Sequence, residues 1–194
     1  QTGELDIYNI VWKTQSQHSA ESMPCGGGDI GLNIWVEDGA ILFYMARSGV
    51  FDENNAMPKL GRVRVKLSPN PFEGNIFRQE LDLQEGCVKI YGKNGRHTAE
   101  ILVWVDVFRP VIHLDVESNR KIVMEASYES WRYEDRPLEK NEGFGNSFKW
   151  ELPEGQLSKK DEISFNKNAV LFYHHNQGET VFDITVRQQK MEQV

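Results

Sequence analysis

A tryptophan, an amide and a carboxylate share one face of a strand-like segment near the start of the chain. In residues 29–36 the aliphatic side chains alternate on one face, which leaves Asp29, Asn33 and Trp35 on the other. A planar ring beside amides and carboxylates suits a sugar, because a sugar offers an apolar ring face edged with hydroxyl groups. The alternative is that a second layer or a neighbouring domain covers this face, which would make Trp35 a core residue.

Carboxylates in the irregular parts of the chain raise the question of acid–base catalysis. Asp29, Asp52, Glu53 and Glu129 lie in or near such segments, and glycosidases use two carboxyl groups at a set separation. The chain has 29 acidic residues, so a pair on loops is expected by chance, and most acidic side chains are solvated charges. We therefore predict no catalytic residues within this chain.

A glycine-rich run at residues 26–31 has the spacing of a dinucleotide-binding fingerprint. That fingerprint needs a strand before the turn and a helix after it, so that backbone amides face the pyrophosphate. Here a polar loop precedes the run, and the alternation of Ile30, Leu32, Ile34 and Val36 after it indicates a strand. We therefore interpret the glycines as an irregular turn leading into a strand, and we predict no cofactor.

The histidines and cysteines give no pattern typical of a metal site. His174 and His175 are adjacent, and successive side chains of a strand point to opposite faces, so they cannot share one ion. Cys25 and Cys87 are the only cysteines, too few for a disulfide-rich scaffold and not clustered as zinc ligands are. We predict no metal, and a half-buried thiol rather than a nucleophile at Cys25. Whether the two cysteines are paired or free stays open.

Charge and hydropathy exclude two classes of partner. The formal net charge is −7, so no global positive field attracts a nucleic acid or an anionic membrane surface. The longest apolar stretches, at residues 40–46 and 101–105, are far shorter than the ~20 residues that a membrane-spanning helix needs. We expect neither nucleic-acid binding nor a membrane span.

Hydrophobic periodicity predicts an all-β protein. Apolar and polar residues alternate in Val63, Val65 and Leu67 with Arg62, Arg64 and Lys66 between them, as in a half-buried strand. About a dozen segments have this character, at residues 5–13, 29–36, 40–46, 63–67, 76–83, 87–91, 98–108, 112–116, 121–129, 147–151, 169–175 and 180–187.

Turn residues between these segments predict antiparallel pairing. Asp38-Gly39 and Asn94-Gly95 can supply the positive φ that tight hairpins need. With 194 residues the chain has room for one domain, or two at most, and the strand count predicts a large antiparallel β-sandwich. A helix is expected nowhere except at the tail, residues 188–194. Three longer segments, 14–28, 47–59 and 131–146, lie outside the strand pattern, and loops of this length are usually functional or mobile.

Several segments resemble the N-terminal β-sandwich of large bacterial proteins that are grouped with glycoside hydrolases. The resemblance rests on SMPCGGGDIGLNIWV at residues 22–36, LFY at 42–44, LGRVRV at 60–65, FYH at 172–174 and FDITVR at 182–187. The sequence is also similar to the N-terminal domain of the inverting α-L-fucosidases of glycoside hydrolase family 95. It departs from that pattern at Gly27, where Asn is usual, and at Cys25, where an aliphatic residue is usual.

The resemblance implies a super-sandwich of the galactose-mutarotase-like type over residues 1–187. Residues 188–194 would then begin a linker to a C-terminal (α/α)6 barrel that carries the acid and base. The protein would be secreted or periplasmic, with its signal segment removed. As an accessory domain it would pack on the catalytic barrel of the same polypeptide and lend loops to the cleft that binds a carbohydrate.

The long loops and the resemblance together select six residues for such a cleft. They are Trp35, Asp52, Asn54, Trp131, Arg132 and His174. Two alternatives stay open: a free-standing carbohydrate-binding module, which presents exposed aromatic rings on one sheet, and a structural interaction domain with an uncovered apolar patch.

Overall fold

The computed structural model describes residues 3–58, 60–146 and 154–191, and the chain forms two compact units. Unit 1 comprises residues 1–48 and 60–129. Unit 2 comprises residues 49–59 and 130–194, so the long segment between two strands of unit 1 belongs to unit 2.

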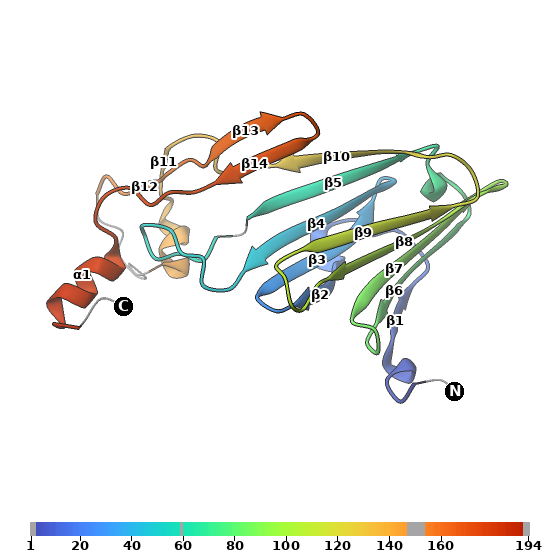
Figure 1. The fold of residues 1–194 in the computed structure, drawn as a ribbon, viewed down its shortest axis with the longest axis horizontal. Coiled ribbons are helices and arrows are strands. Elements are labelled where there is room, and N and C mark those ends of the chain that lie inside the picture. Colours follow the sequence, from blue (N-terminus) through green and yellow to red (C-terminus); the bar gives the residue numbers. More distant parts are fainter. Residues whose placement is uncertain (1–2, 59, 147–153, 192–194) are drawn as a thin grey trace. The chain divides into compact units, whose positions relative to one another are not determined.

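Unit 1 is an antiparallel sandwich of two five-stranded sheets (Figure 1). The first sheet has the order β1-β6-β7-β8-β9, with bounds Ile10–Trp12, Ile76–Asp82, Cys87–Asn94, His97–Val105 and Ile112–Ser118. The second has the order β10-β5-β4-β3-β2, with bounds Val123–Glu129, Gly61–Ser68, Ala40–Arg47, Ile30–Glu37 and Met23–Gly27. The predicted all-β fold with antiparallel sheets is confirmed.

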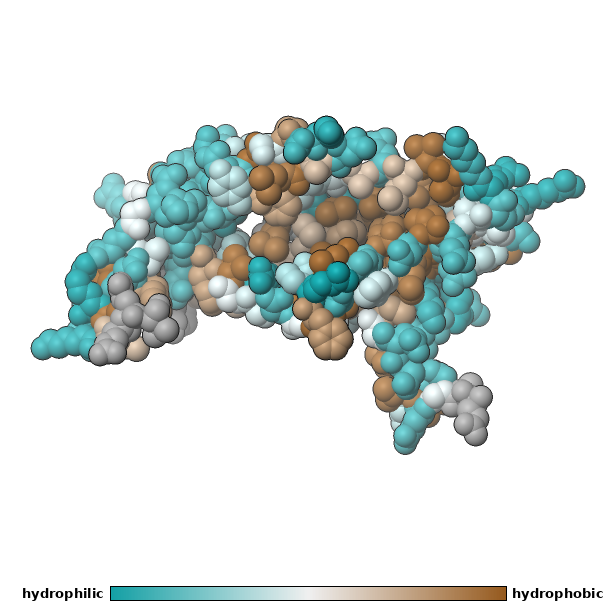
Figure 2. Space-filling model, viewed as in Figure 1, coloured by the Kyte–Doolittle hydropathy of each residue, from teal (hydrophilic) through white to brown (hydrophobic). Residues whose placement is uncertain are grey.

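The core of unit 1 lies between the sheets, where the alternating side chains meet. In β8, Ala99, Ile101, Val103 and Val105 are buried while the residues between them are less so. Each large aliphatic side chain removed from water in this way stabilises the fold by roughly 1.5–3 kcal/mol. Figure 2 shows hydrophobic side chains gathered between the strands of this unit and hydrophilic side chains along its rim.

Two predicted hairpins form at the turns that the sequence indicated. Asp38 and Gly39 both have positive φ, 49° and 72°, between β3 and β4. Gly95 has φ 60° between β7 and β8. These left-handed conformations are tolerated by Gly and by Asp, which is why the dipeptides mark the turns.

The glycine-rich run contains the turn that we predicted, at Gly28 and Asp29, but Gly26 and Gly27 before it belong to a strand, β2. β2 pairs with β3 in register from Met23↔Ile34 to Gly27↔Ile30, and Gly28 makes the turn with φ 59°. A Cβ built on Gly27 would lie 2.9 Å from the carbonyl oxygen of Val105 and 3.2 Å from Cγ1 of Val107. Glycine is therefore needed because the end of β8 approaches β2 closely, and no helix follows the run.

The start of the chain is less extended than predicted. Within residues 5–13 a 3-10 helix, η1 (Asp6–Tyr8), precedes the short strand β1. Two further 3-10 helices in unit 1 are η2 (Ser19–Glu21), which packs against β3, and η3 (Pro71–Glu73), whose first turn is capped by the Asn70 side chain.

Unit 2 contains short elements joined by polar loops. Its described elements are β11 (Arg136–Pro137), η4 (Lys140–Gly145), β12 (Leu157–Ser158), β13 (Glu162–Asn166), β14 (Ala169–Tyr173) and α1 (Val181–Gln188). β11 pairs with β12, and β13 with β14, both antiparallel. The predicted strand at 169–175 is present as β14, and the one at 147–151 lies outside the described residues.

The prediction of a strand at residues 180–187 is wrong, because this segment forms α1. The Thr180 hydroxyl accepts a hydrogen bond from the Asp183 backbone N–H at 3.1 Å, and the Asp183 carboxylate accepts one from the Thr180 N–H at 2.9 Å. This reciprocal capping box starts a helix despite the β-branched residues that follow. The domain boundary placed at residue 187 stays a prediction, and α1 ends at Gln188. Among the described residues, no helix has the length and apolar character required to cross a bilayer.

Because β2 approaches β8 closely at Gly27, this position should not tolerate a side chain, whereas Gly31 should tolerate one. We expect Gly27→Ala to lower the free energy of unfolding by about 1–3 kcal/mol, because the new methyl group overlaps Val105 and Val107. Gly31→Ala is the matched control, since a Cβ there meets nothing within 4 Å, and it should stay within about 0.5 kcal/mol of the original protein. Urea unfolding of both variants measures this, and equal losses would contradict the close approach.

Candidate functional site

The loop at residues 49–59 folds around the Asp52 side chain. Asp52 Oδ1 accepts hydrogen bonds from the backbone N–H groups of Asn54, at 3.0 Å, and Ala56, at 2.9 Å. The Asn54 side chain then donates to the carbonyl oxygen of Leu157 at 2.9 Å. Both side chains are buried, Asp52 with 8% and Asn54 with 2% of its surface exposed. This loop is therefore fixed by its own polar side chains and attached to β12.

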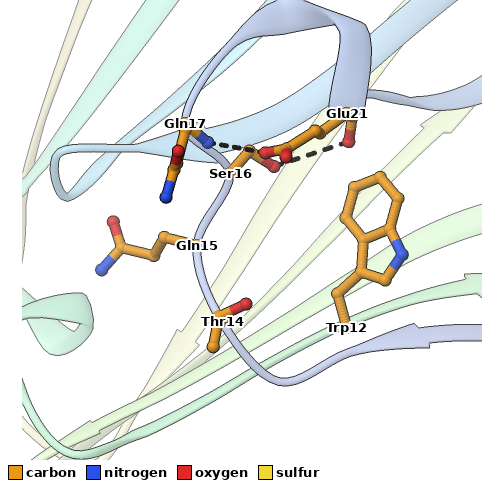
Figure 3. Close-up of a pocket in the computed structure, with 6 residues that line it drawn as sticks. All are labelled: Trp12, Thr14, Gln15, Ser16, Gln17 and Glu21. Atoms are coloured by element: carbon orange, nitrogen blue, oxygen red, sulfur yellow. Dashed lines mark hydrogen bonds between the residues drawn. The ribbon is translucent and has the colours of Figure 1, made fainter.

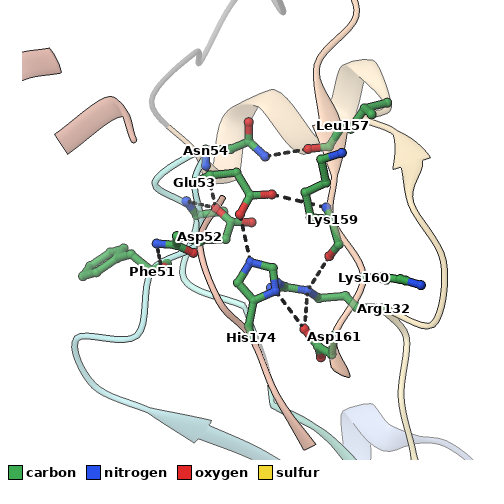
Figure 4. Close-up of polar contacts among 12 residues, drawn as sticks. Phe51, Asp52, Glu53, Asn54, Arg132, Leu157, Lys159, Lys160, Asp161 and His174 are labelled. Atoms are coloured by element: carbon green, nitrogen blue, oxygen red, sulfur yellow. Dashed lines mark hydrogen bonds and ion pairs between the residues drawn. The ribbon is translucent and has the colours of Figure 1, made fainter. Parts of the chain in front are cut away.

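Beside it, His174 lies between two carboxylates (Figure 4). Its Nε2 is 2.8 Å from Glu53 Oε2 and its Nδ1 is 3.1 Å from Asp161 Oδ1. Each imidazole nitrogen is thus within hydrogen-bond distance of one carboxylate. His174 therefore joins the 49–59 loop to the segment before β13.

Arg132 completes this group, which we call the His174 cluster (Glu53, Arg132, Asp161 and His174). Arg132 Nε lies 3.1 Å from Asp161 Oδ1 and also donates to the carbonyl oxygen of Lys159 at 3.3 Å. All four side chains are largely buried, with 12–15% of their surface exposed. Arg132 Nη2 is buried with no hydrogen-bond partner among the described atoms. Arg132 and His174 thus lie against two carboxylates, and Nη2 of Arg132 has no partner among the described atoms.

A cavity of about 410 Å³, which we call the η4 pocket, opens beside this cluster and lies entirely within unit 2. Its wall combines one large aromatic ring, several amides, two carboxylates and two guanidinium groups with an apolar strip. The lining residues are Asp52, Asn54, Ala56, Met57, Pro58, Trp131, Arg132, Arg136, Leu138, Asn141, Glu142, Gly145, Asn146 and Ser158.

One wall of the η4 pocket is fixed by a bidentate ion pair. Arg136 donates from Nη1 to Glu142 Oε2 at 2.8 Å and from Nη2 to Oε1 at 2.6 Å. Glu142 also accepts from the backbone N–H of Glu139, which fixes the start of η4. The hydrogen bond from Arg136 holds the pKa of Glu142 below its ordinary value, so this carboxylate is ionised and committed to its partner at neutral pH.

Asp52 and Arg132 also line a second cavity of about 320 Å³, together with His174 and His175. Burial raises the pKa of Asp52; hydrogen bonds from the backbone of Ala56 and Asn54 and the charge of Arg132 oppose that rise, whereas Glu53 adds to it. A carboxyl group with a raised pKa at the wall of two cavities is able to hold or release a proton near a ligand. The pKa of Asp52 is thus raised, whereas that of Glu142, which lines the same η4 pocket, is lowered.

Unit 1 has a smaller cavity of about 310 Å³, formed by β1 and the segment that leads to η2 (Figure 3). Trp12, Thr14, Gln15, Ser16, Gln17 and Glu21 line it. The Gln15 amide is fixed at both ends, because Nε2 donates to the Phe72 carbonyl and Oε1 accepts from the Gly39 N–H, both at 2.8 Å. The Glu21 carboxylate accepts from the Gln17 N–H at 2.7 Å. These contacts shape the wall around Trp12.

Five of the six residues selected from the sequence come together in unit 2. Asp52, Asn54, Trp131 and Arg132 line the η4 pocket, and His174 belongs to the neighbouring cavity. They come from distant parts of the chain, and the hydrogen bond between His174 and Glu53, the neighbour of Asp52, spans 121 residues. The structure therefore brings together four residues of the predicted long loops with His174, which follows β14.

Trp35 is the exception, because it is a core residue of unit 1 with no exposed surface. Its ring packs against Tyr44 at a centroid distance of 4.8 Å, and its Nε1 donates to Glu37 at 2.8 Å. The alternative that we considered, in which this face is covered, therefore applies to Trp35, and η2 lies against β3. Trp35 is thus unavailable to a ligand at the surface of this unit.

Several residues of the site were not singled out from the sequence. Asp161 and Arg136 lie in charged stretches where nothing distinguishes a buried ion pair from a solvated charge, and Asn141 lies in a turn of η4. Trp12 lies in a segment that we interpreted as one long strand. A tryptophan at the edge of a predicted long loop is a sequence signal for a pocket residue, and both Trp12 and Trp131 have such a position.

The chemistry available to unit 2 is therefore recognition by hydrogen bonds and ring stacking. The η4 pocket offers a ring, amides and charged groups, with Asp52 able to change its protonation state. Within residues 3–58, 60–146 and 154–191, no group of three or more His, Cys, Asp or Glu side chains is arranged to hold a metal ion.

A family model described as "Domain of unknown function (DUF5703)" matches residues 11–194, which is nearly the whole chain. A search of curated proteins gave no match.

The His174 cluster predicts that adjacent histidines differ in their contribution to stability. His174→Ala leaves Glu53 without its cation and Asp161 with Arg132 alone, so we expect the free energy of unfolding to fall by about 2–4 kcal/mol. His175→Ala is the matched control, because its side chain is exposed, and it should change stability by no more than about 0.5 kcal/mol. Urea unfolding of both variants measures the difference, and similar effects would contradict the cluster.

The pKa of Asp52 predicts a pH dependence of stability with a definite sign. Because its folded-state pKa is raised, the folded protein holds this proton more tightly than the unfolded chain, and stability falls as the pH rises from about 4. Asp52→Asn removes that fall while keeping an oxygen for the two N–H groups. The variant should therefore gain stability relative to the original protein between pH 4 and neutral pH.

Asp135→Asn is a control of opposite sign. Hydrogen bonds from the Lys160 backbone and the Lys159 side chain lower the pKa of Asp135, so its ionisation stabilises the fold as the pH rises. Relative to the original protein, this variant should lose stability as the pH rises through the acid range. Urea unfolding at several pH values compares the two curves, and curves that move in the same direction would contradict the assignment.

Proposed function

The chain belongs to the DUF5703_N family, and we propose that it is the accessory, sugar-binding N-terminal domain of a secreted glycoside hydrolase. In this proposal unit 2 supplies the sugar contacts through the η4 pocket. The acid and base of hydrolysis come from a C-terminal (α/α)6 domain of the same polypeptide. The observation that carries the proposal is the composition of the η4 pocket.

That composition fits a carbohydrate better than other small ligands. Trp131 is half exposed, with 44% of its surface open, so its ring can stack on a sugar face. Asn54, Asn141 and Asn146 place amides around the same cavity, where they can meet hydroxyl groups. The volume of about 410 Å³ lies in the range of roughly 300–1,000 Å³ typical of ligand pockets.

The charges around the pocket also favour a neutral ligand. Arg136 and Glu142 neutralise each other, and Arg132 is paired with Asp161. No strong net field is therefore left to select an anion or a cation. A neutral sugar needs hydrogen-bond donors and acceptors of both kinds, which is what paired charges and amides provide.

An apolar hairpin face supports the second part of the proposal, packing on another domain. The β13–β14 register pairs Ile163 with Phe172 and Phe165 with Val170, so four apolar side chains share one face. Phe165 is 81% exposed, and Ile163 and Val170 are 37% and 42% exposed. A two-stranded hairpin with such a face is marginal in water and gains stability when a partner covers it.

A free-standing binding module is the second candidate. Every residue that lines the η4 pocket belongs to unit 2, so the pocket does not need another domain for its wall. Such a module would bind its sugar with full affinity by itself. An accessory domain that shares a cleft would bind more weakly alone than together with the catalytic domain.

The test is titration calorimetry of the chain against a panel of neutral monosaccharides and oligosaccharides. We expect Trp131→Ala to weaken binding at least about tenfold, because stacking on an indole ring contributes more than 1 kcal/mol. Tyr133→Ala is the matched control, since this ring is 68% exposed in the same segment but does not line the pocket. It should bind as the original protein does.

The same preparations separate binding from catalysis. We expect no hydrolysis of aryl α-glycosides by this chain. Turnover that Asp52→Asn abolishes would overturn the accessory role, because Asp52 would then act as an acid or base. Absence of binding to every sugar in the panel, by this chain and by a longer chain with the C-terminal domain, would overturn sugar binding and leave a structural interaction domain.

A further inference from the structure

β10 is an edge strand of unit 1 whose free side is open to solvent (Figure 1). It pairs with β5 along seven residues, from Val123↔Ser68 to Glu129↔Arg62, and in the described part of the chain no strand pairs with its other side. Its first five residues are exposed and the last two are half-buried. Every second residue of such a strand directs its backbone N–H and C=O groups outward, where another strand can pair with them.

The apolar side chains of β10 are also uncovered. Met124 and Ala126 lie opposite Leu67 and Val65 of β5, which are buried in the core of unit 1, so all four side chains share one face of the sheet. Met124 is nevertheless 51% exposed, and Val123 at the start of the strand is 62% exposed. The core is therefore not closed at this edge, and a second strand beside β10 would cover apolar surface as well as backbone.

The other edge strands of the two sheets are less suited to pairing. β1 has three residues, and β2 contains Pro24 and packs against β7 and β8. β9 is as long as β10, but pairing of all its residues with a second β9 would place Asp115 opposite its own copy. Like charges directly opposite each other in a sheet are destabilising. The long edge that remains is β10.

The residues of β10 are complementary to a second, antiparallel copy of the same strand. Directly opposite residues share a face, so the apolar face must meet the apolar face of the copy. When Ala126 lies opposite Ala126 of the second copy, all seven residues are paired and Glu125 meets Ser127. A shift of the pairing by one step that keeps the faces matched would place Glu125 opposite its own copy or opposite Glu129. The charges thus select one register, which is also the one with the longest overlap.

The neighbouring strand β5 completes this charge pattern. Glu125 lies opposite Lys66, and Ser127 lies opposite Arg64. Across the junction the row would contain Lys66 and Glu125 of one copy, followed by Ser127 and Arg64 of the second copy. Arg64 also donates to Glu129 at 2.7 Å, so this second carboxylate of β10 is engaged within its own copy. The junction therefore places no two carboxylates directly opposite each other.

We propose that β10 is a self-association surface, and that two copies of this chain pair their β10 strands antiparallel about a two-fold axis at Ala126. The two five-stranded sheets then join into one continuous sheet. The same strand serves both copies, so the assembly closes as a dimer and does not grow into a filament. The contact involves unit 1 and does not depend on a ligand in the η4 pocket.

The first measurement is sedimentation equilibrium of the chain between about 1 μM and 1 mM, the range in which a weak to moderate dimer is detected. We expect a monomer–dimer equilibrium. A monomer over the entire range, or species that grow beyond the dimer with concentration, would contradict the proposal.

Opposite charges at Ser127 make the test specific for the register. Ser127→Lys would face Glu125 of the second copy at two symmetric positions, so it should tighten the dimer by roughly 2- to 30-fold, and Ser127→Glu should weaken it by a similar factor. Within one copy the effect on folding has the opposite sign, because this position lies opposite Arg64. By urea unfolding the Glu variant should therefore be the more stable of the two, so a change in dimer affinity cannot be mistaken for a change in folding.

Ser48→Lys and Ser48→Glu are the matched controls, since Ser48 is an exposed serine that follows β4 and lies outside β10. They change the net charge by the same amount as the Ser127 variants. At physiological ionic strength, where distant charges are screened, they should leave the dimer affinity unchanged. Ser127 variants that both shift the affinity in one direction, or that behave as the Ser48 variants do, would overturn the proposed register and with it the proposal.

Discussion

Unit 2 depends on the burial of charges that must find partners. Among its described residues, Val186 is the buried hydrophobic side chain, whereas Asp52, Asn54, Asn146 and Ser158 are buried polar ones. The described segments are joined by the ion pairs of the His174 cluster and by side-chain bonds to backbone groups. A buried charge is costly unless it is paired, so these contacts restrict the loops to arrangements that keep every partner in place.

The two units therefore achieve order by different physical means. In unit 1, alternating aliphatic residues bury a continuous core between two sheets, and the energy is spread over many equivalent contacts. In unit 2 a few directional contacts hold irregular segments, and the cavities lie between those segments. Polar networks of this kind specify one geometry when they are satisfied, which suits a pocket that must present groups at fixed positions.

The sequence predicted the strands of unit 1 because half-buried strands have a local signal, the alternation of side chains seen in β5 and β8. It failed where non-local or competing signals decide. Thr180 and Asp183 start α1 although Val181, Ile184 and Val186 favour a strand. β2 was not predicted because the reason for its glycines is a close contact with Val105, which is far away in the sequence. The contact of Glu53 with His174 spans 121 residues, so the candidate loops could be selected from the sequence but the cluster could not.

The described carboxylates of unit 2 differ in how far they are committed to structural contacts. An acid or base must exchange a proton during the reaction, and a carboxylate held by a cation resists protonation. Glu142 is held by Arg136 in this way. Asp52 departs from this pattern, yet its Oδ1 already accepts two backbone hydrogen bonds that shape its loop. One carboxyl group that is partly committed to structure can orient a hydroxyl group, whereas glycoside hydrolysis generally needs a second carboxyl group across the bond.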